Sequence, residues 1–313
     1  GMNGFSQLEG LRGHPSVVRV IGHRGARGVM PENTLEGFAF TLAAGVRALE
    51  FDVVMTADGV PVVTHNHHLA NAMTRDGQGH WLTGAERQVA EMTYAEIRAL
   101  DVGGLDGRTV YGRRFPDQAF LTGIHVPRLG ELLDLCAGYG DQAPYLLLEL
   151  KSDPALMHDH AARAEMVAAV LADVRRYRME PRTVMHSFDW ALLGECRRQA
   201  PDLPTSYLSQ LPENADDPGE DSAKPVGPDY DRMTESLPQA VASAGGQLWC
   251  PYFLDVTPEL VAEAHDLGLI VLTWTVNEPE DIRRMATTGV DGIVTDYPGR
   301  TQRILIDMGL SWT

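Results

Sequence analysis

The chain is poor in three features that mark particular protein classes: cysteine, long hydrophobic runs and positive charge. Its three cysteines, Cys136, Cys196 and Cys250, are odd in number and widely spaced, which argues against a disulfide framework and against a zinc site. No apolar run approaches the roughly 18 residues of a membrane span, and no signal-peptide core precedes His23. We therefore expect a protein of a reducing compartment, the cytoplasm, without stable membrane insertion.

Acidic side chains dominate the charge. Lysine and arginine total 26 against 43 aspartates and glutamates, a formal net charge of −17. Such a charge disfavours nucleic acid, or an anionic membrane surface, as a general partner. The hydrophobic fraction of 44% is ample for a buried core, and 313 residues suffice for one large α/β barrel or for two smaller domains.

Polar residues that can carry chemistry gather early in the chain. An apolar run over 17–22 predicts a strand that ends at His23. A second predicted strand carries Glu50 and Asp52, which lie two residues apart and so project from the same face. The sequence thus predicts an imidazole and a carboxylate pair on neighbouring strands.

A hairpin is predicted directly after this carboxylate pair. Asp58-Gly59 separates two apolar runs, and the second run is too close in sequence to form a parallel strand. An antiparallel return places Thr64 opposite Asp52 and brings His65 back beside the carboxylates. Two imidazoles with two carboxylates between them suit a divalent cation and acid–base chemistry.

Strands and helices alternate over most of the chain. Helices are predicted at 34–44, 129–137, 159–178, 190–199, 258–267, 279–288 and 298–308. Parallel strands are predicted to start near Val17, Arg47, Tyr145, Thr183, Pro204, Leu248, Leu269 and Gly292. Eight such strands predict an α/β protein with a (β/α)8 TIM-barrel fold, whose active sites form at the carboxyl ends of the strands. Residues at these ends are His23, Glu50, Asp52, Glu149, Lys151, His186, Trp274 and Asp296.

The start of the helix at 34–44 has two interpretations. Asn33 could be its N-cap, with Glu36 three residues later as in a capping box, and Gly45 follows its end. Alternatively, Asn33 acts directly in the site. The adjacent Glu32 is either a site residue or a hydrogen-bonding partner for its own loop.

These motifs, taken together and in order, resemble those of the glycerophosphodiester phosphodiesterase family. The resemblance spans nearly the whole chain, and one departure is plain, because Asn66 stands where the family usually has aspartate. The matching segments are His23-Arg24-Gly25, Pro31-Glu32-Asn33-Thr34, Glu50-x-Asp52, His65-Asn66, Leu148-Glu149-Leu150-Lys151, Trp274-Thr275-Val276-Asn277 and the run Asp291 to Asp296.

The resemblance also bears on a metal site. Glu50, Asp52 and Glu149 form an all-oxygen set that suits one divalent cation, Mg²⁺ or Ca²⁺, rather than zinc. The alternative is a structural charge network with Arg24 and Lys151, which would bury many charges at high cost. The family resemblance points to the same three carboxylates as metal ligands.

Roles for the remaining residues follow in part from the resemblance, which implies that His23 and His65 act as general acid and base. Arg24 offers a planar fork that matches two phosphate oxygens, and Lys151 adds a point charge. Trp274 would pack against the glycerol, or else close the top of the barrel core. The candidates for supporting roles are Glu32, Asn33 and Asn66, and His186 is expected to be a wall of the pocket.

Two stretches interrupt the alternation. Residues 66–126 resemble the insertion that the family carries after the second barrel strand, and we expect a cap of loops and one or two short helices, one of them at 93–99. Its aromatic residues form a small satellite core or line the substrate: Trp81, Tyr94, Tyr111, Phe115 and Phe120. Residues 211–238, with eight acidic and two basic side chains, predict an acidic surface loop, with a functional lid as the alternative.

The resemblance implies a metal-dependent phosphoric diester hydrolase of one domain, residues 1–313, that cleaves small glycerophosphodiesters to glycerol 3-phosphate and an alcohol. The hydrolysis would proceed either through a cyclic phosphate that then opens to water or by direct attack of water. A lysophospholipase D-like activity on a larger lipid is the neighbouring alternative. A phosphodiester-binding protein with weakened catalysis is the other, because Asn66 brings no charge to favour an imidazolium.

Overall fold

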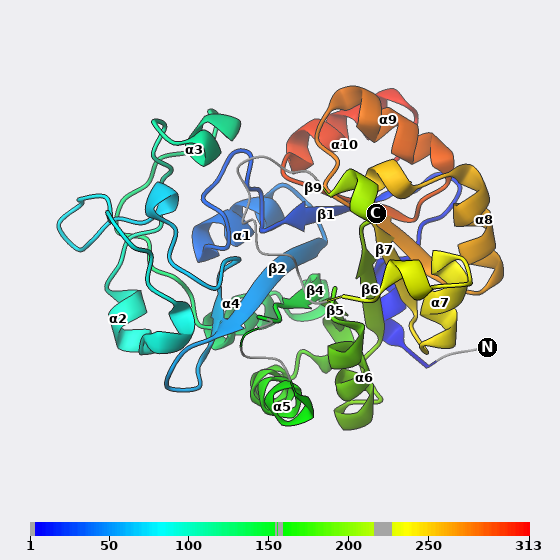
Figure 1. Cartoon of the computed structure of the whole chain (residues 1–313). Coiled ribbons are helices and arrows are strands. Elements are labelled where there is room, and N and C mark those ends of the chain that lie inside the picture. The colour runs from blue at the N-terminus through cyan, green and yellow to red at the C-terminus, as the bar shows by residue number, and fades with distance from the viewer. Residues whose placement is uncertain (1–3, 154, 156–158, 216–226) are drawn as a thin grey trace.

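A computed structural model of the chain describes residues 4–153, 155, 159–215 and 227–313. Parallel strands form a closed barrel with helices on its outside (Figure 1). The barrel strands are β1 (Arg19–His23), β2 (Ala48–Met55), β4 (Tyr145–Leu150), β5 (Thr183–Ser187), β6 (Thr205–Ser209), β7 (Leu248–Pro251), β8 (Ile270–Thr273) and β9 (Gly292–Thr295). They pair in chain order, and β1 pairs with both β2 and β9, which closes the barrel. The predicted TIM barrel is confirmed.

The hairpin after the second barrel strand is also confirmed. Strand β3 (Pro61–Val63) runs antiparallel to β2, with Val63 opposite Val53. The register continues one residue further, since the amide of Thr64 donates to the carbonyl of Asp52 at 3.1 Å. Gly59 turns the chain with a φ of +75°, a conformation that glycine adopts without steric cost.

The helices that cover the barrel are α1 (Leu35–Ala43), α4 (Leu129–Ala137), α5 (His160–Arg176), α6 (Trp190–Gln199), α7 (Leu237–Ser243), α8 (Pro258–Asp266), α9 (Pro279–Thr288) and α10 (Pro298–Asp307). The bounds of α4, α6 and α9 are those expected from the sequence. Helix α7 was not predicted, because Pro238 makes this stretch look like a loop. The structure places Pro238 in the first turn, where a missing N–H breaks no helical hydrogen bond, and Ser236 caps the helix by accepting from the amide of Gln239.

The amino-terminal segment closes one end of the barrel, a role that its sequence pattern does not predict. A short 3₁₀ helix, Ser6–Gly10, leads into Leu11, and Leu8 and Leu11 pack into the apolar barrel interior beside Ile21 and Leu147. This plug lies where the strands begin. The carboxyl ends of the strands are therefore the end at which polar residues converge.

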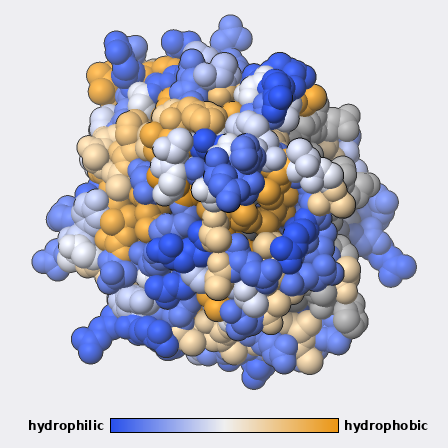
Figure 2. Space-filling model, turned by 90° about the vertical axis from the view of Figure 1, so that its left-hand side faces the viewer, coloured by the Kyte–Doolittle hydropathy of each residue, from blue (hydrophilic) through white to orange (hydrophobic). Residues whose placement is uncertain are grey.

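The insertion after β2, residues 66–126, lies beside the barrel on the left of Figure 1. It contains α2 (Tyr94–Arg98), within the helix expected at 93–99 and capped by Thr93, and α3 (Val110–Arg114). A satellite core joins it to the hairpin, and Tyr94 packs against that core as predicted. Figure 2 looks at the molecule from this side and shows apolar patches interrupted by polar side chains. The insertion is thus a packed layer, anchored to β2 and β3.

The predicted acidic loop, 211–238, is described only in part, since residues 216–226 lie outside the described residues. Its described parts include two 3₁₀ turns, Pro212–Asn214 and Tyr230–Arg232, and its predicted end overlaps the start of α7. Among the helices of the described residues, none combines the length and the apolar character needed to cross a membrane.

Candidate active site

A cluster of three carboxylates lies at the carboxyl ends of β2 and β4. Glu50 and Asp52 come from β2 and Glu149 from β4, where Asp52 and Glu149 are register neighbours. All three side chains are buried, and each offers an oxygen such that the three atoms lie within 4.8 Å of one another. The structure therefore brings together the three residues for which the sequence predicts a divalent cation.

The electrostatics of the cluster fit a cation. Burial raises the pKa of Glu50, and the neighbouring carboxylates raise it further. Burial also raises the pKa of Glu149, to about 7, against the opposing effect of Lys151. Burial would raise the pKa of Asp52 as well, but Lys151, His65 and Arg24 outweigh it and hold that pKa well below its usual range. Two of the three carboxylates thus resist ionisation, and a divalent cation would supply the missing positive charge.

Arg24 and Lys151 do contact the carboxylates, as the charge-network alternative expects. Nζ of Lys151 lies 2.6 Å from Glu149 and 3.6 Å from Asp52, and Nε of Arg24 lies 3.4 Å from Asp52. Yet Oε1 of Glu50 is buried and has no hydrogen-bond partner among the described residues. An orphaned buried carboxylate oxygen is costly, and it faces a cluster of hard oxygen donors. The three carboxylates therefore form a group that could hold a divalent cation.

His23 ends β1, which lies between β2, the strand of Glu50 and Asp52, and β9. Its Nδ1 lies 2.7 Å from Oδ1 of Asp296, at the end of β9, and its Nε2 lies 3.6 Å from Oε2 of Glu50. Burial lowers the pKa of His23, although Asp296 opposes this shift. Because a carboxylate accepts at Nδ1, the proton resides there, and Nε2 faces the carboxylates.

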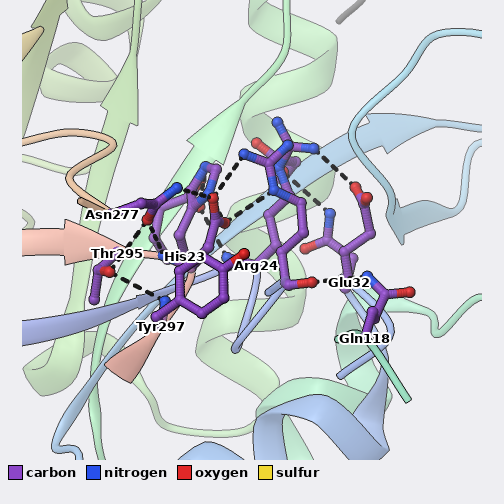
Figure 3. Close-up of polar contacts among 12 residues, drawn as sticks. His23, Arg24, Glu32, Gln118, Asn277, Thr295 and Tyr297 are labelled. Carbon is purple, nitrogen blue, oxygen red and sulfur yellow. Dashed lines mark hydrogen bonds and ion pairs between the residues drawn. The ribbon is translucent and has the colours of Figure 1, made fainter. Parts of the chain in front are cut away.

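Asp296 has no assigned role in the sequence analysis, which only places it at a strand end. In the structure, the guanidinium of Arg27 makes a bidentate contact with Asp296, from Nε to Oδ1 at 2.9 Å and from Nη2 to Oδ2 at 3.0 Å. The side-chain amide of Asn277 donates to Oδ2 of the same carboxylate at 2.8 Å (Figure 3). Burial would raise the pKa of Asp296, but Arg27 and His23 hold it well below its usual range. An ionised carboxylate in fixed orientation therefore stands behind His23.

His65 follows the hairpin and carries its own hydrogen-bond partner. Its Nδ1 lies 2.8 Å from the side-chain oxygen of Asn66. An amide oxygen only accepts, so Nδ1 donates, and Nε2 carries no proton in the neutral ring. Asn66 thus provides one hydrogen bond without negative charge.

The turn after β1 holds two residues in the left-handed region, Arg24 with φ 52° and Asn33 with φ 54°. Such strain at non-glycine residues is typical of functional sites. The predicted N-cap at Asn33 is wrong. Thr34 caps α1 by accepting from the amide of Gly37, whereas the Asn33 side chain donates to Asp52 at 3.1 Å. Asn33 is therefore a hydrogen-bond partner of the carboxylate cluster.

Glu32 is part of the site as well. Its Oε2 accepts from Nη1 of Arg24 at 2.8 Å (Figure 3). Its Oε1 accepts from the hydroxyl of Tyr111, a residue of the insertion. All of Arg24 and Glu32 is buried. The pair fixes the guanidinium beside Asp52.

Trp274 follows β8, whereas His186 lies on β5 beside Glu149. The indole of Trp274 donates to the carbonyl of Cys250 at 3.0 Å and packs edge-on against Phe188. It also packs against the interior core, as expected of a residue that closes the barrel. His186 bonds Ser206 at 2.8 Å, and burial lowers its pKa to about 3, so it is a neutral wall residue.

Comparison with known proteins agrees with this geometry. Residues 23–300 match the glycerophosphoryl diester phosphodiesterase family. A glycerophosphodiester phosphodiesterase of Caldanaerobacter subterraneus is 28% identical over 279 residues, which cover 89% of this chain and 94% of the relative. A Mycobacterium tuberculosis protein, provisionally named as such an enzyme, is 30% identical, with 96% of this chain and 95% of its own covered.

Solved structures agree in fold. A crystal structure from Silicibacter pomeroyi DSS-3, provisionally described as a glycerophosphoryl diester phosphodiesterase, is 96% identical, with a TM-score of 0.94 over 99% of this chain and 100% of that one. An Oleispira antarctica phosphodiesterase in complex with its product sn-glycerol-3-phosphate has a TM-score of 0.70 at 20% identity, over 93% of this chain and 97% of that one. The chain therefore belongs to the glycerophosphoryl diester phosphodiesterase family and is a phosphoric diester hydrolase.

Proposed function

We propose that the chain cleaves small glycerophosphodiesters to glycerol 3-phosphate and an alcohol, with one divalent cation, Mg²⁺ or Ca²⁺, and two histidines. The observation that carries this proposal is the convergence of His23 with three buried carboxylates at one barrel mouth. Membership of the family supports the diester bond as the target. The product bound to the Oleispira antarctica phosphodiesterase is consistent with glycerol 3-phosphate.

Glu50, Asp52 and Glu149 would hold the cation, which supplies positive charge to a phosphate oxygen. Arg24 would bind a further phosphate oxygen through its guanidinium, and Lys151 would balance charge that builds on phosphorus in the transition state. The charged groups of Arg24 and Lys151 already lie within 4 Å of Asp52, so both side chains are held beside the carboxylates before substrate binds. Trp274 would then cover the glycerol side of the mouth.

His23 and His65 would each take up or release a proton at Nε2, because Nδ1 of each ring already donates to a neighbouring oxygen. One histidine takes a proton from the attacking hydroxyl, either that of the glycerol or that of water. The other gives a proton to the oxygen of the departing alcohol. Asp296 stabilises an imidazolium at His23, whereas Asn66 orients His65 without charge.

The test is release of glycerol 3-phosphate from glycerophosphocholine and glycerophosphoethanolamine, with Mg²⁺, Ca²⁺, Mn²⁺ or EDTA. Lysophosphatidylcholine is assayed beside them, since Val110 and Phe120 leave apolar side chains exposed on the insertion. Metal-dependent release from the small diesters supports the proposal. Full turnover by metal-stripped protein in EDTA refutes the metal role, and a preference for lysophosphatidylcholine favours the lipid alternative.

Cation binding should strengthen as pH rises. Glu149 and Glu50 have raised pKa values, so the folded apo-protein holds protons that the unfolded chain has lost above about pH 4.5. Their contribution to stability is present below that pH. It is lost as pH rises through the raised pKa of each group, which is about 7 for Glu149. A cation must displace these protons, so we expect affinity to rise by up to about tenfold per pH unit per proton.

The measurement for this prediction is the shift in melting temperature on adding Mg²⁺ or Ca²⁺ at pH 5.5 and at pH 8. The shift should be larger at pH 8, and the difference should shrink in Glu149→Gln. Equal shifts at both pH values would contradict the prediction. Asp52 does not contribute, because its lowered pKa keeps it ionised throughout.

The alternative of a phosphodiester-binding protein with weakened catalysis rests on Asn66, and substitution of that residue tests it directly. Asn66→Asp would keep the hydrogen bond to Nδ1 of His65 and add a negative charge. We expect a several-fold change in kcat and a shift of the His65 limb of the pH–rate profile to higher pH. Unchanged rate and profile would show that the amide already suffices. Large activation of an almost inactive parent would favour the binding-protein alternative.

A further inference from the structure

Tyr111 of α3 connects the insertion to the side chains of the site. Its hydroxyl contacts three buried residues at once. It donates to Oε1 of Glu32, and it lies 3.4 Å from Nη1 of Arg24 and 3.2 Å from Nη1 of Arg27. A phenol can donate one hydrogen bond and accept two, so this arrangement satisfies its full capacity.

The two arginines lead to opposite parts of the site. Arg24 contacts Asp52 of the carboxylate cluster at 3.4 Å. Arg27 donates two hydrogen bonds to Asp296, which in turn orients His23. The Tyr111 hydroxyl is therefore the one atom, among the contacts described, that bridges the phosphate-binding arginine and the support of the catalytic histidine.

The surroundings hold the ring of Tyr111 in place. Its edge packs against Phe115 at 5.5 Å between centroids, and the guanidinium of Arg27 lies 4.4 Å over that Phe115 ring. Further along, Gln118 donates to the carbonyl of Arg27 at 2.8 Å (Figure 3). The insertion thus docks on the turn after β1 through stacked rings and hydrogen bonds, which restrict where the hydroxyl can point.

Gly112 shows that this docking is shaped by sequence. A Cβ at Gly112 would lie 2.0 Å from the carbonyl oxygen of Asp106, so only glycine lets α3 fold against its own entry loop. Asp106 is also tied by Arg108 at 2.9 Å. These local contacts set the position of α3, and with it the position of Tyr111.

We propose that Tyr111 is a positioning residue for the phosphodiesterase reaction, acting through Arg24 and Arg27. Without its hydroxyl, Glu32 and both guanidiniums each lose a partner in a buried place, where water does not replace it at low cost. The orientation of the Arg24 guanidinium is then less restricted, and so is that of the Arg27 guanidinium that bonds Asp296. This inference rests on the proposed function of the same site, and it makes the insertion part of the catalytic machinery.

The test is Tyr111→Phe, which removes one oxygen and keeps the ring stack. We expect kcat/KM for glycerophosphocholine to fall about tenfold, with a rise in KM and a matching loss of affinity for glycerol 3-phosphate measured by calorimetry. The matched control is Tyr94→Phe, since Tyr94 is also an insertion tyrosine whose hydroxyl is bonded, to Glu131 and the carbonyl of Val126, away from the catalytic residues. It should lose stability without losing kcat/KM.

Three outcomes would overturn the inference. One is a Tyr111→Phe protein with the KM and kcat of Tyr94→Phe. Another is a loss that only follows the fraction of folded protein, with KM unchanged. If the parent protein shows no turnover, the proposed function is refuted, and affinity for glycerol 3-phosphate becomes the readout for Tyr111. Equal affinity in the parent and in Tyr111→Phe is then the third outcome, and it overturns the positioning role as well.

Discussion

Replacement of His23 with alanine is expected to slow hydrolysis of glycerophosphocholine by about 10²- to 10⁴-fold, the usual contribution of a general acid or base. The imidazole is buried, with Asp296 behind it and the carboxylate cluster in front, so no neighbouring side chain can take its place. The change should appear in kcat more than in KM, because the proposed role of His23 is proton transfer and that of Arg24 is phosphate binding. His80→Ala is the control, since His80 is exposed on the insertion.

The same variant separates acid from base when the leaving group is varied. A p-nitrophenolate leaves without a proton, whereas choline needs one. His23→Ala and His65→Ala should therefore be compared on glycerophosphocholine and on the p-nitrophenyl diester of glycerol 3-phosphate. The variant whose deficit shrinks with the nitrophenyl substrate lacks the general acid. A His23→Ala enzyme within tenfold of the parent on glycerophosphocholine would contradict a catalytic role for His23.

The second large effect is expected for Asp296→Asn, a loss on the order of 10²- to 10⁴-fold in kcat/KM. The amide offers one acceptor in place of two, and Arg27, Asn277 and His23 all require acceptors there. Arg27 is buried and would lose its ion pair with Asp296, which costs stability. His23 would then lose the partner that fixes its proton on Nδ1.

The chain provides a matched control for this variant. Asp291 accepts from Nε2 of His265 at 2.8 Å, a second buried aspartate paired with histidine, but at the end of the barrel where β9 begins. Asp291→Asn should reduce the melting temperature with little change in kcat/KM. Equal losses of activity in the two variants would show that Asp296 acts only on stability.

Much of the site was predictable because its parts are local. The pairing of Thr64 with Asp52 follows from the length of the hairpin, and the common face of Glu50 and Asp52 follows from strand periodicity. The barrel then brings the strand ends together, as its eight strands require. The carboxylate cluster could be named on these grounds before any coordinates.

Other features depend on contacts that local patterns do not encode. Asn33 and Thr34 are both good N-cap residues, and only the contact of Asn33 with Asp52 decides which of them caps α1. The role of Asp296 depends on a partner 273 residues away. Tyr111 lies in an insertion without clear periodicity, so nothing in its neighbourhood marks it among the other aromatic residues.

The closure of the barrel has a consequence for the order in which the enzyme becomes competent. The first strand, β1, carries His23, and it pairs with the last strand, β9, beyond which Asp296 lies. A growing chain that has not yet reached residue 296 can contain the carboxylates, Arg24 and His65, yet its His23 has no carboxylate behind it. The final strand therefore both closes the barrel and brings Asp296 to Nδ1 of His23, so this contact forms only once the last strand has been made.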